Sequence, residues 1–319
     1  MTIRFRYFPY LVQQMIMRHM DFLDVFSLYA ISQKSQTLAK SYFNRLECKL
    51  SYEKYDGIRI RRKTSPGDFC WTSDQLKLKP MMRKRKRVLN FCATRYSKQY
   101  QIPLETSGNM CDGVLRFARD LFPKIVFNFD FGASSPSDFR RMMNLTKILN
   151  VPVETVDIHH YKINDSFMRE ILTECFDVKI LTAIGSSSSF QYDFQTNAPF
   201  KFDYFRLSNA AWVTKDHLVN LFLGCKKVIL DLEELHYSDQ ELVEIIEKWL
   251  QAPKPQYLGL FGARTLPENI GKLPGAVPVR EKADGTPVII YHDGERNCIT
   301  LRTDFMDRLN DDGNVDIHG

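Results

Sequence analysis

The sequence contains no stretch of about 18 uncharged, apolar residues, the length that a membrane-spanning helix needs. Its first twenty residues are apolar in places, but Arg4, Arg6 and Arg18 interrupt them, so they make a poor signal peptide. None of the seven cysteines lies at C-x-x-C spacing from another, which argues against a zinc knuckle or a redox pair. We therefore expect a soluble protein of the cytoplasm or nucleus, with free thiols and without a cofactor.

Catalytic signatures are missing as well. There is no P-loop and no G-x-G-x-x-G motif, and residues 185–189 lack the closing glycine of a nucleophile elbow. His159 and His160 are adjacent, so at a strand end they would face opposite sides and could not readily share a metal ion. We expect the cluster after residue 230 to be a loop of solvated charges; it consists of Asp231, Glu233, Glu234 and His236.

Three further residue types could carry chemistry but have simpler interpretations. His217 could serve as a base, but no nucleophile is identifiable near it. Cys225 precedes an apolar strand, where a thiol is usually a small core residue. Trp212 and Trp249 are spaced as core anchors. The sequence therefore predicts a protein that is not an enzyme, and a hydrolase that uses the polar loops near Ser186 and Glu233 is kept as a further alternative.

Positive charge is concentrated in one segment. The whole chain carries 44 Lys and Arg against 38 Asp and Glu, a net charge of +6. Residues 49–100 hold 15 of the basic and only 4 of the acidic residues, a local charge of +11, which leaves −5 for the remainder. The run Arg83-Lys84-Arg85-Lys86-Arg87 could be a nuclear-import signal or a phosphate-binding patch. We favour a solvated charged edge leading into a strand, and keep a basic nucleic-acid-binding protein as the alternative function.

Residues 8–46 are the most regular part of the chain and predict three short helices. Apolar residues recur there at intervals of three and four, the period of one helix face. Pro9 suits a first helical turn, and Asp21 and Ser32 can cap the second and third helices. The residues expected on these faces are Phe8, Leu11, Val12, Met15 and Ile16, then Phe22, Val25, Phe26 and Tyr29, then Ser35, Leu38, Ala39, Tyr42, Phe43 and Leu46.

Three helices of this size hold more large apolar residues than their common centre can bury. The surplus consists of Leu11, Val12, Ile16, Leu23, Leu28 and Ile31. Two interpretations remain open. The surplus packs on the rest of the chain, or it forms a surface that fills a groove in a partner protein.

The same segment resembles an F-box. Residues 8–12, 16, 20–22 and 26–35 are similar to this family, in which a Leu/Phe-Pro start leads into three helices and an Ile/Val-Ser-x-Lys stretch opens the third. F-boxes bind the Skp-type adaptor of SCF (Skp–cullin–F-box) ubiquitin ligases. The resemblance assigns the adaptor contact to Phe8, Pro9, Leu11, Val12, Ile16, Leu28, Ile31, Ser32 and Lys34.

Beyond Cys48 short alternating pieces predict strands, for example residues 58–61 and 68–71. From about residue 122, strand-like pieces centred near 126, 157, 180, 206, 229 and 258 alternate with helical pieces at 136–149, 167–175, 214–223 and 240–250. This spacing suits strand–helix units stacked as a leucine-rich-repeat-like solenoid, and equally an ordinary βαβ sheet. We expect an α+β or α/β body of parallel strands with helices on one side.

A second resemblance lies within this body. Residues 209–218, 225–230, 248–250 and 257–260, and more loosely 281–290, are similar to the F-box-associated type 2 region of nematode F-box proteins. The match covers roughly residues 196–262 and implies a fold rather than a binding site. Together the two resemblances imply an F-box at 1–48 and an F-box-associated, substrate-recruiting domain at 49–319. The chain would then be the substrate-recognition subunit of an SCF-type ubiquitin ligase, with a Skp-type adaptor, a cullin-RING ligase and an unknown protein target as partners.

Overall fold

The computed structural model describes residues 7–20, 22–53, 57–62, 75–83, 86–93, 99–103, 109–132, 135–159, 163–184, 190–193, 197–232, 236–262, 279–293 and 298–303. The chain has a mixed α/β fold and divides into two compact units, Met1–Glu154 and Thr155–Gly319. None of the described helices combines the length and apolar character that crossing a membrane requires.

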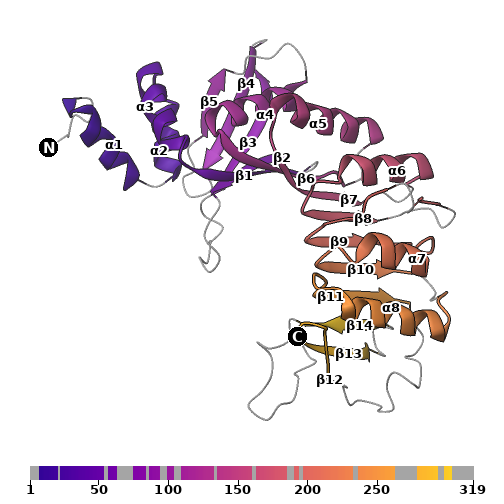
Figure 1. Ribbon diagram of the computed structural model, residues 1–319. Helices are drawn as coiled ribbons and strands as arrows, with labels where there is room; N and C mark the ends of the chain where they lie inside the picture. Colours follow the sequence, from indigo (N-terminus) through magenta and orange to yellow (C-terminus); the bar gives the residue numbers. More distant parts are fainter. Residues whose placement is uncertain are drawn as a thin grey trace. The chain divides into compact units, whose positions relative to one another are not determined.

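The first unit begins with three helices and continues into a mixed sheet (Figure 1). Along the sheet the strand order is β6-β1-β2-β3-β4-β5, with β1 and β6 parallel and the other neighbours antiparallel. Its elements are α1 (Tyr10–Arg18), α2 (Phe22–Tyr29), α3 (Gln33–Phe43), β1 (Glu47–Glu53), β2 (Gly57–Arg62), β3 (Gln75–Arg83), β4 (Lys86–Ala93), β5 (Gln99–Pro103), α4 (Met110–Leu121), β6 (Lys124–Asp130) and α5 (Pro136–Leu149).

The second unit consists of parallel strands that follow one another in chain order, closed by an antiparallel hairpin region. Strands β7, β8, β9, β10 and β11 are each parallel to the next, and β14, β13 and β12 continue the sheet antiparallel. Its elements are β7 (Val153–His159), α6 (Asp165–Glu174), β8 (Ile180–Ile184), β9 (Tyr204–Leu207), α7 (Lys215–His217), the π-helix η3 (Leu218–Phe222), β10 (Lys227–Asp231), α8 (Asp239–Gln251), β11 (Tyr257–Phe261), β12 (Val279–Glu281), β13 (Pro287–Asp293) and β14 (Cys298–Arg302).

The strand and helix positions expected from about residue 122 onward are confirmed. Each of the six predicted strand centres falls at or beside β6, β7, β8, β9, β10 or β11, and the predicted helix at 136–149 has the bounds of α5. Residues 58–61 lie in β2, whereas the strand expected at 68–71 lies outside the described residues. The coarse class, parallel strands with connecting helices, therefore holds.

Local sequence signals explain where the helices begin and end. At α5, the Ser135 hydroxyl accepts a hydrogen bond from the Asp138 backbone N–H, Pro136 occupies the first turn, and Asn150 ends the helix in the left-handed conformation with φ 51°. At α8, Ser238 and Glu241 form a capping box.

Ser32 caps α3 as predicted, since its hydroxyl accepts a hydrogen bond from the Ser35 backbone N–H at 3.2 Å. We expect Ser32→Ala to lower the free energy of unfolding by about 1 kcal/mol, because an N–H of the first turn loses its acceptor. Ser32→Asp, which keeps an acceptor at this position, is the matched control. Urea unfolding of the two variants checks the prediction, and equal stabilities would contradict it.

Candidate protein-docking surface

The N-terminal helices carry most of the large apolar side chains that the described part of the chain leaves exposed. Leu11 is 73% exposed and Ile31 60%, whereas the one such residue outside this region, Ile148 on α5, is 61% exposed. We call the N-terminal group the N-terminal apolar surface; it consists of Tyr7, Phe8, Tyr10, Leu11, Met15 and Ile31. Single exposed apolar residues need no explanation, but six within 25 residues are a concentration that makes this region a candidate interaction surface.

The orientation of α1 produces this exposure. Met17 is the buried residue of α1, and it is two positions from the exposed Met15, about 200° around the helix. On the α3 side, the Gln14 side-chain amide donates a hydrogen bond to the Ser41 hydroxyl at 3.4 Å. The apolar periodicity predicted the helix correctly; on its apolar face Phe8, Leu11 and Met15 are exposed, and Val12 and Ile16 are half-buried.

Helices α2 and α3 share an aromatic cluster centred on Phe43 of α3. The centroid of the Phe43 ring lies 6.0 Å from that of Phe22 and 5.9 Å from that of Phe26, both on α2. It lies 5.0 Å from the ring centroid of Phe122, which follows α4. Tyr29 adds an edge contact to Phe117 of α4 at 6.1 Å. Because Phe22, Phe26, Phe43 and Phe122 are all buried, α2 and α3 are fixed to the rest of the first unit.

Of the apolar surplus, Leu11 and Ile31 are exposed and Val12, Ile16 and Leu28 are half-buried, while the side chain of Leu23 lies outside the described residues. The inner faces of α2 and α3 pack on the chain itself, while α1 and the α2–α3 connection keep apolar side chains in contact with water. Of the residues that the F-box resemblance assigns to the adaptor, some are exposed and the others half-buried. The exposed ones are Phe8, Pro9, Leu11, Ile31 and Lys34, and the half-buried ones are Val12, Ile16, Leu28 and Ser32.

Three residues of the N-terminal apolar surface were not among those assignments. Tyr10 is 56% exposed, and its hydroxyl accepts a hydrogen bond from the Gln14 amide at 2.7 Å, which holds the ring beside α1. Tyr7 and Met15 are also exposed. The signal was present in the sequence, since Tyr7, Phe8 and Tyr10 place three aromatic rings within four positions before and at the helix start.

The residues considered for catalysis have structural roles or lie outside the described part. The Thr214 backbone N–H donates to Nδ1 of His217, and Nε2 lies 2.6 Å from the Tyr192 carbonyl oxygen. A backbone N–H only donates and a carbonyl only accepts, so the ring is neutral with its proton on Nε2, and both nitrogens are occupied. His217 therefore completes a capping box with Thr214.

The other candidates form no site among the described residues. His159 is exposed at the end of β7 and His236 is exposed, whereas residues 160, 185–189, 233 and 234 lie outside the described part. Trp212 and Trp249 are buried core residues, as expected. Within that part of the chain, no three His, Cys, Asp or Glu side chains come together as metal ligands would.

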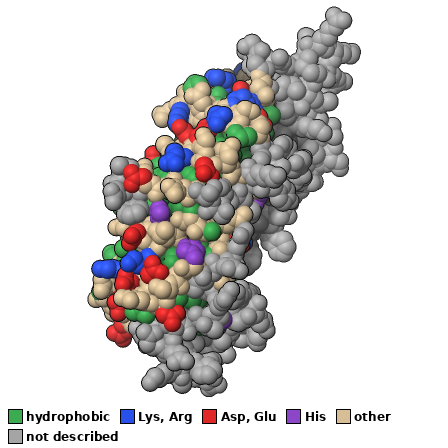
Figure 2. Space-filling view, turned by 90° about the vertical axis from the view of Figure 1, so that its right-hand side faces the viewer, with side chains coloured by type: hydrophobic (Ala, Val, Ile, Leu, Met, Phe, Trp, Pro, Cys, Tyr) green, Lys and Arg blue, Asp and Glu red, His purple; other side chains and the backbone are tan. Residues whose placement is uncertain are grey.

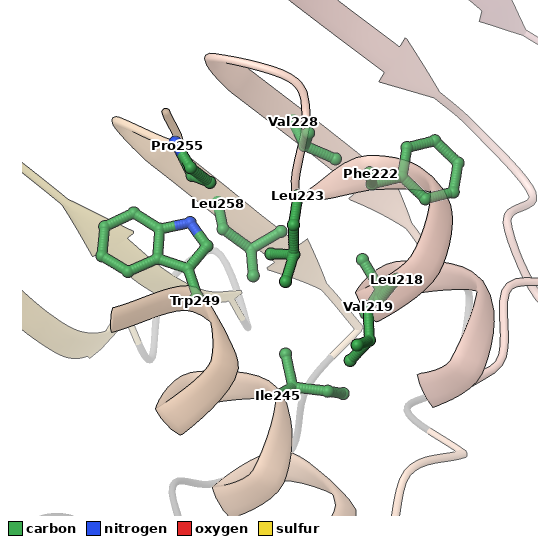
Figure 3. A pocket seen from close by; sticks show the side chains of 9 residues that line it. All are labelled: Leu218, Val219, Phe222, Leu223, Val228, Ile245, Trp249, Pro255 and Leu258. Atoms are coloured by element: carbon green, nitrogen blue, oxygen red, sulfur yellow. The ribbon is translucent and has the colours of Figure 1, made fainter. Parts of the chain in front are cut away.

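An apolar pocket lies between η3 and α8 in the second unit (Figure 3). Its cavity of about 10 Å³ has room for one water-sized group. The lining includes Trp249, whose buried indole N–H has no acceptor among the described residues. The complete lining is Leu218, Val219, Phe222, Leu223, Val228, Ile245, Trp249, Pro255 and Leu258. This pocket is too small and too uniformly apolar to hold a substrate beside catalytic groups.

Burial disfavours the thiolate form of two interior cysteines, Cys175 and Cys225. Burial raises the pKa of the Cys225 thiol to about 12, and it raises the pKa of Cys175 as well. At pH 8 about one Cys225 in ten thousand is then a thiolate, the nucleophilic form. We expect native protein to leave Cys225 unlabelled by iodoacetamide at pH 8, and urea-unfolded protein to label fully, as read by peptide mass spectrometry. Equal labelling of both samples would contradict this.

On the face drawn in Figure 2, acidic and basic side chains of the described residues are interspersed. No cluster of like charge among them therefore indicates a second binding site on that face. For the basic segment, the structure describes the backbone of Arg83, Lys86 and Arg87 at the β3–β4 hairpin, whereas Lys84 and Arg85 lie outside the described residues.

Comparison with known proteins adds no relative. No family model matches the chain, and neither the curated proteins nor the solved structures contain a match. The functional argument therefore depends on the residues and geometry of the chain itself.

Proposed function

We propose that this chain is the substrate-recognition subunit of an SCF-type ubiquitin ligase and that α1–α3 are an F-box that binds a Skp-type adaptor. The observation that carries the proposal is the N-terminal apolar surface, where Leu11 on α1, Phe8 before α1 and Ile31 between α2 and α3 are exposed. The buried Phe43 cluster holds α2 and α3 to the first unit. Phe8, Leu11 and Ile31 are also residues to which the F-box resemblance assigns the adaptor contact. Burying them in an adaptor groove would contribute about 1.5–3 kcal/mol per side chain.

We assign residues 49–319 to recruitment of a protein target. The order of β7 to β11, each parallel to and beside the next, supports a leucine-rich-repeat-like arrangement, because a solenoid stacks its strands in chain order. The surface that holds the target is not assigned by this argument.

In this role the chain contributes no chemistry of its own. It connects the target to the adaptor and, through the adaptor, to a cullin-RING ligase that carries the ubiquitin-loaded enzyme. The rate gain comes from the raised local concentration of the target lysine near the ubiquitin thioester. The chain would act in the cytoplasm or the nucleus.

Co-expression with a Skp-type adaptor, followed by size-exclusion chromatography with light scattering, tests the proposal. We expect the full chain and the adaptor to elute together as a one-to-one complex. Elution of a well-folded chain apart from excess adaptor would overturn the proposal, and the three helices would then be a cap on the first unit.

A further inference from the structure

The antiparallel strands of the first unit separate their residues into an apolar and a basic face. Because consecutive strand residues alternate between faces and paired residues share one, the register assigns each position to a face. One face contains Leu50, Ile58, Ile60 and Leu76, and the first three are buried. On that side Tyr52 lies 6.3 Å from Phe129, so it is the core face.

The opposite positions of β2 to β5 form what we call the basic face, and β1 continues the same side of the sheet with Glu47, Lys49, Ser51 and Glu53. Across β2 to β4 the register brings together six Lys and Arg positions, and none of the described positions on this face of β2 to β5 is acidic or aromatic. Arg59 itself is half-buried. The cationic positions are Arg59, Arg61, Lys77, Lys79, Arg83 and Lys86. The same face also has four positions with side-chain amides, Gln75, Asn90, Gln99 and Gln101.

Two pairs of like charges are directly opposite across this sheet. Arg59 pairs with Lys77 between β2 and β3, and Arg83 pairs with Lys86 between β3 and β4. Neighbouring strands lie about 4.8 Å apart, and Lys77 and Lys79 are separated along β3 by about 6.8 Å. Directly opposed like charges destabilise a sheet. An anion that binds between these positions would reduce the repulsion between them.

We propose that the basic face binds the phosphate backbone of a nucleic-acid duplex without reading its sequence. Lys, Arg, Asn and Gln are the side chains that contact phosphate and sugar in nucleic-acid complexes, and they dominate this face. Single strands are usually held by aromatic stacking, but Phe91 and Tyr100 occupy register positions of the core face. This function goes beyond target recruitment and does not depend on adaptor binding.

Fluorescence anisotropy of the full chain with a labelled 20-base-pair duplex, RNA or DNA, tests the proposal between 50 and 200 mM salt. Six phosphate contacts predict a slope of log affinity against log salt of about −5 and a loss of about 1,000-fold over this range. Lys77→Gln combined with Lys79→Gln should flatten the slope by about 2. Arg87→Gln is the matched control, because its register position belongs to the core face, and it should keep the slope.

Four results would overturn the proposal. These are a slope near zero for the unaltered chain, equal slopes for the double variant and the unaltered chain, tighter binding of a single strand of the same length, and tighter binding of a glutamate-rich peptide at the same salt. The first needs no variant, so it decides the matter even if the double variant fails to fold. None of these four measurements involves the adaptor. A chain that fails to bind the adaptor would therefore give the same nucleic-acid results, and the two proposals can fail independently.

Discussion

Leu11→Asp should abolish adaptor binding, with a loss of affinity of at least about 100-fold. Leu11 is 73% exposed, so in a complex the substitution would remove a buried apolar side chain and place a charge in an apolar groove. The fold should be unaffected, because the position lies in the first turn of α1, where a carboxylate interacts favourably with the helix dipole. Pull-down of the full chain on immobilised adaptor measures the effect.

Ile148→Asp is the control for this result. Ile148 is exposed to a similar extent, 61%, but lies on α5 outside the N-terminal apolar surface. The Ile148→Asp protein should bind the adaptor as the unaltered chain does. Its free energy of unfolding should be lower by about 0.3–1 kcal/mol, because the new carboxylate lies near the C-terminal end of α5. Ile31→Asp should behave as Leu11→Asp does. If Leu11→Asp and Ile148→Asp retain the adaptor equally, the assignment of this surface is wrong.

Phe43→Ala should have the largest effect on stability, a decrease of about 3–5 kcal/mol in the free energy of unfolding. The ring is fully buried and is the common contact of Phe22, Phe26 and Phe122, so its loss leaves a cavity between α2, α3 and the sheet. Adaptor binding should fall with it, because α1 packs on α3, the helix that carries Phe43. Urea unfolding followed by circular dichroism measures the loss.

Tyr10→Ala separates binding from stability. This ring is 56% exposed, and its removal should lower the free energy of unfolding by at most about 0.5 kcal/mol. It should nevertheless weaken adaptor binding, because Tyr10 belongs to the N-terminal apolar surface. A Phe43→Ala protein as stable as the Tyr10→Ala protein would contradict the role given to the aromatic cluster.

Most of the elements could be predicted because their signals are local. A serine before Pro136 and an asparagine after Leu149 define α5 within 16 residues, and the buried strands from β6 to β11 are short apolar pieces at regular spacing. Ser32 was predicted as a cap for the same reason. These signals depend on neighbouring residues and not on how the chain folds back.

The direction of the apolar faces could not be predicted in this way. Whether α1 exposes Leu11 or Met17 depends on α3, and the position of α3 depends on a contact between Phe43 and Phe122, which are far apart in sequence. The basic face is a similar case. The alternation of Lys77 and Lys79 is visible in the sequence, but their alignment with Arg59 requires the strand register. Periodicity identifies a face, and tertiary contacts decide what covers it.

Hydrogen exchange of the full chain with and without the Skp-type adaptor tests the central claim most directly. The account predicts that the adaptor slows exchange in α1 and around Ile31 by at least about tenfold, because exchange then requires these helices to open within a stable complex. Amides of α5, which carries the control residue Ile148, should exchange at unchanged rates. Unchanged exchange throughout α1, α2 and α3, or protection confined to the second unit, would contradict the account.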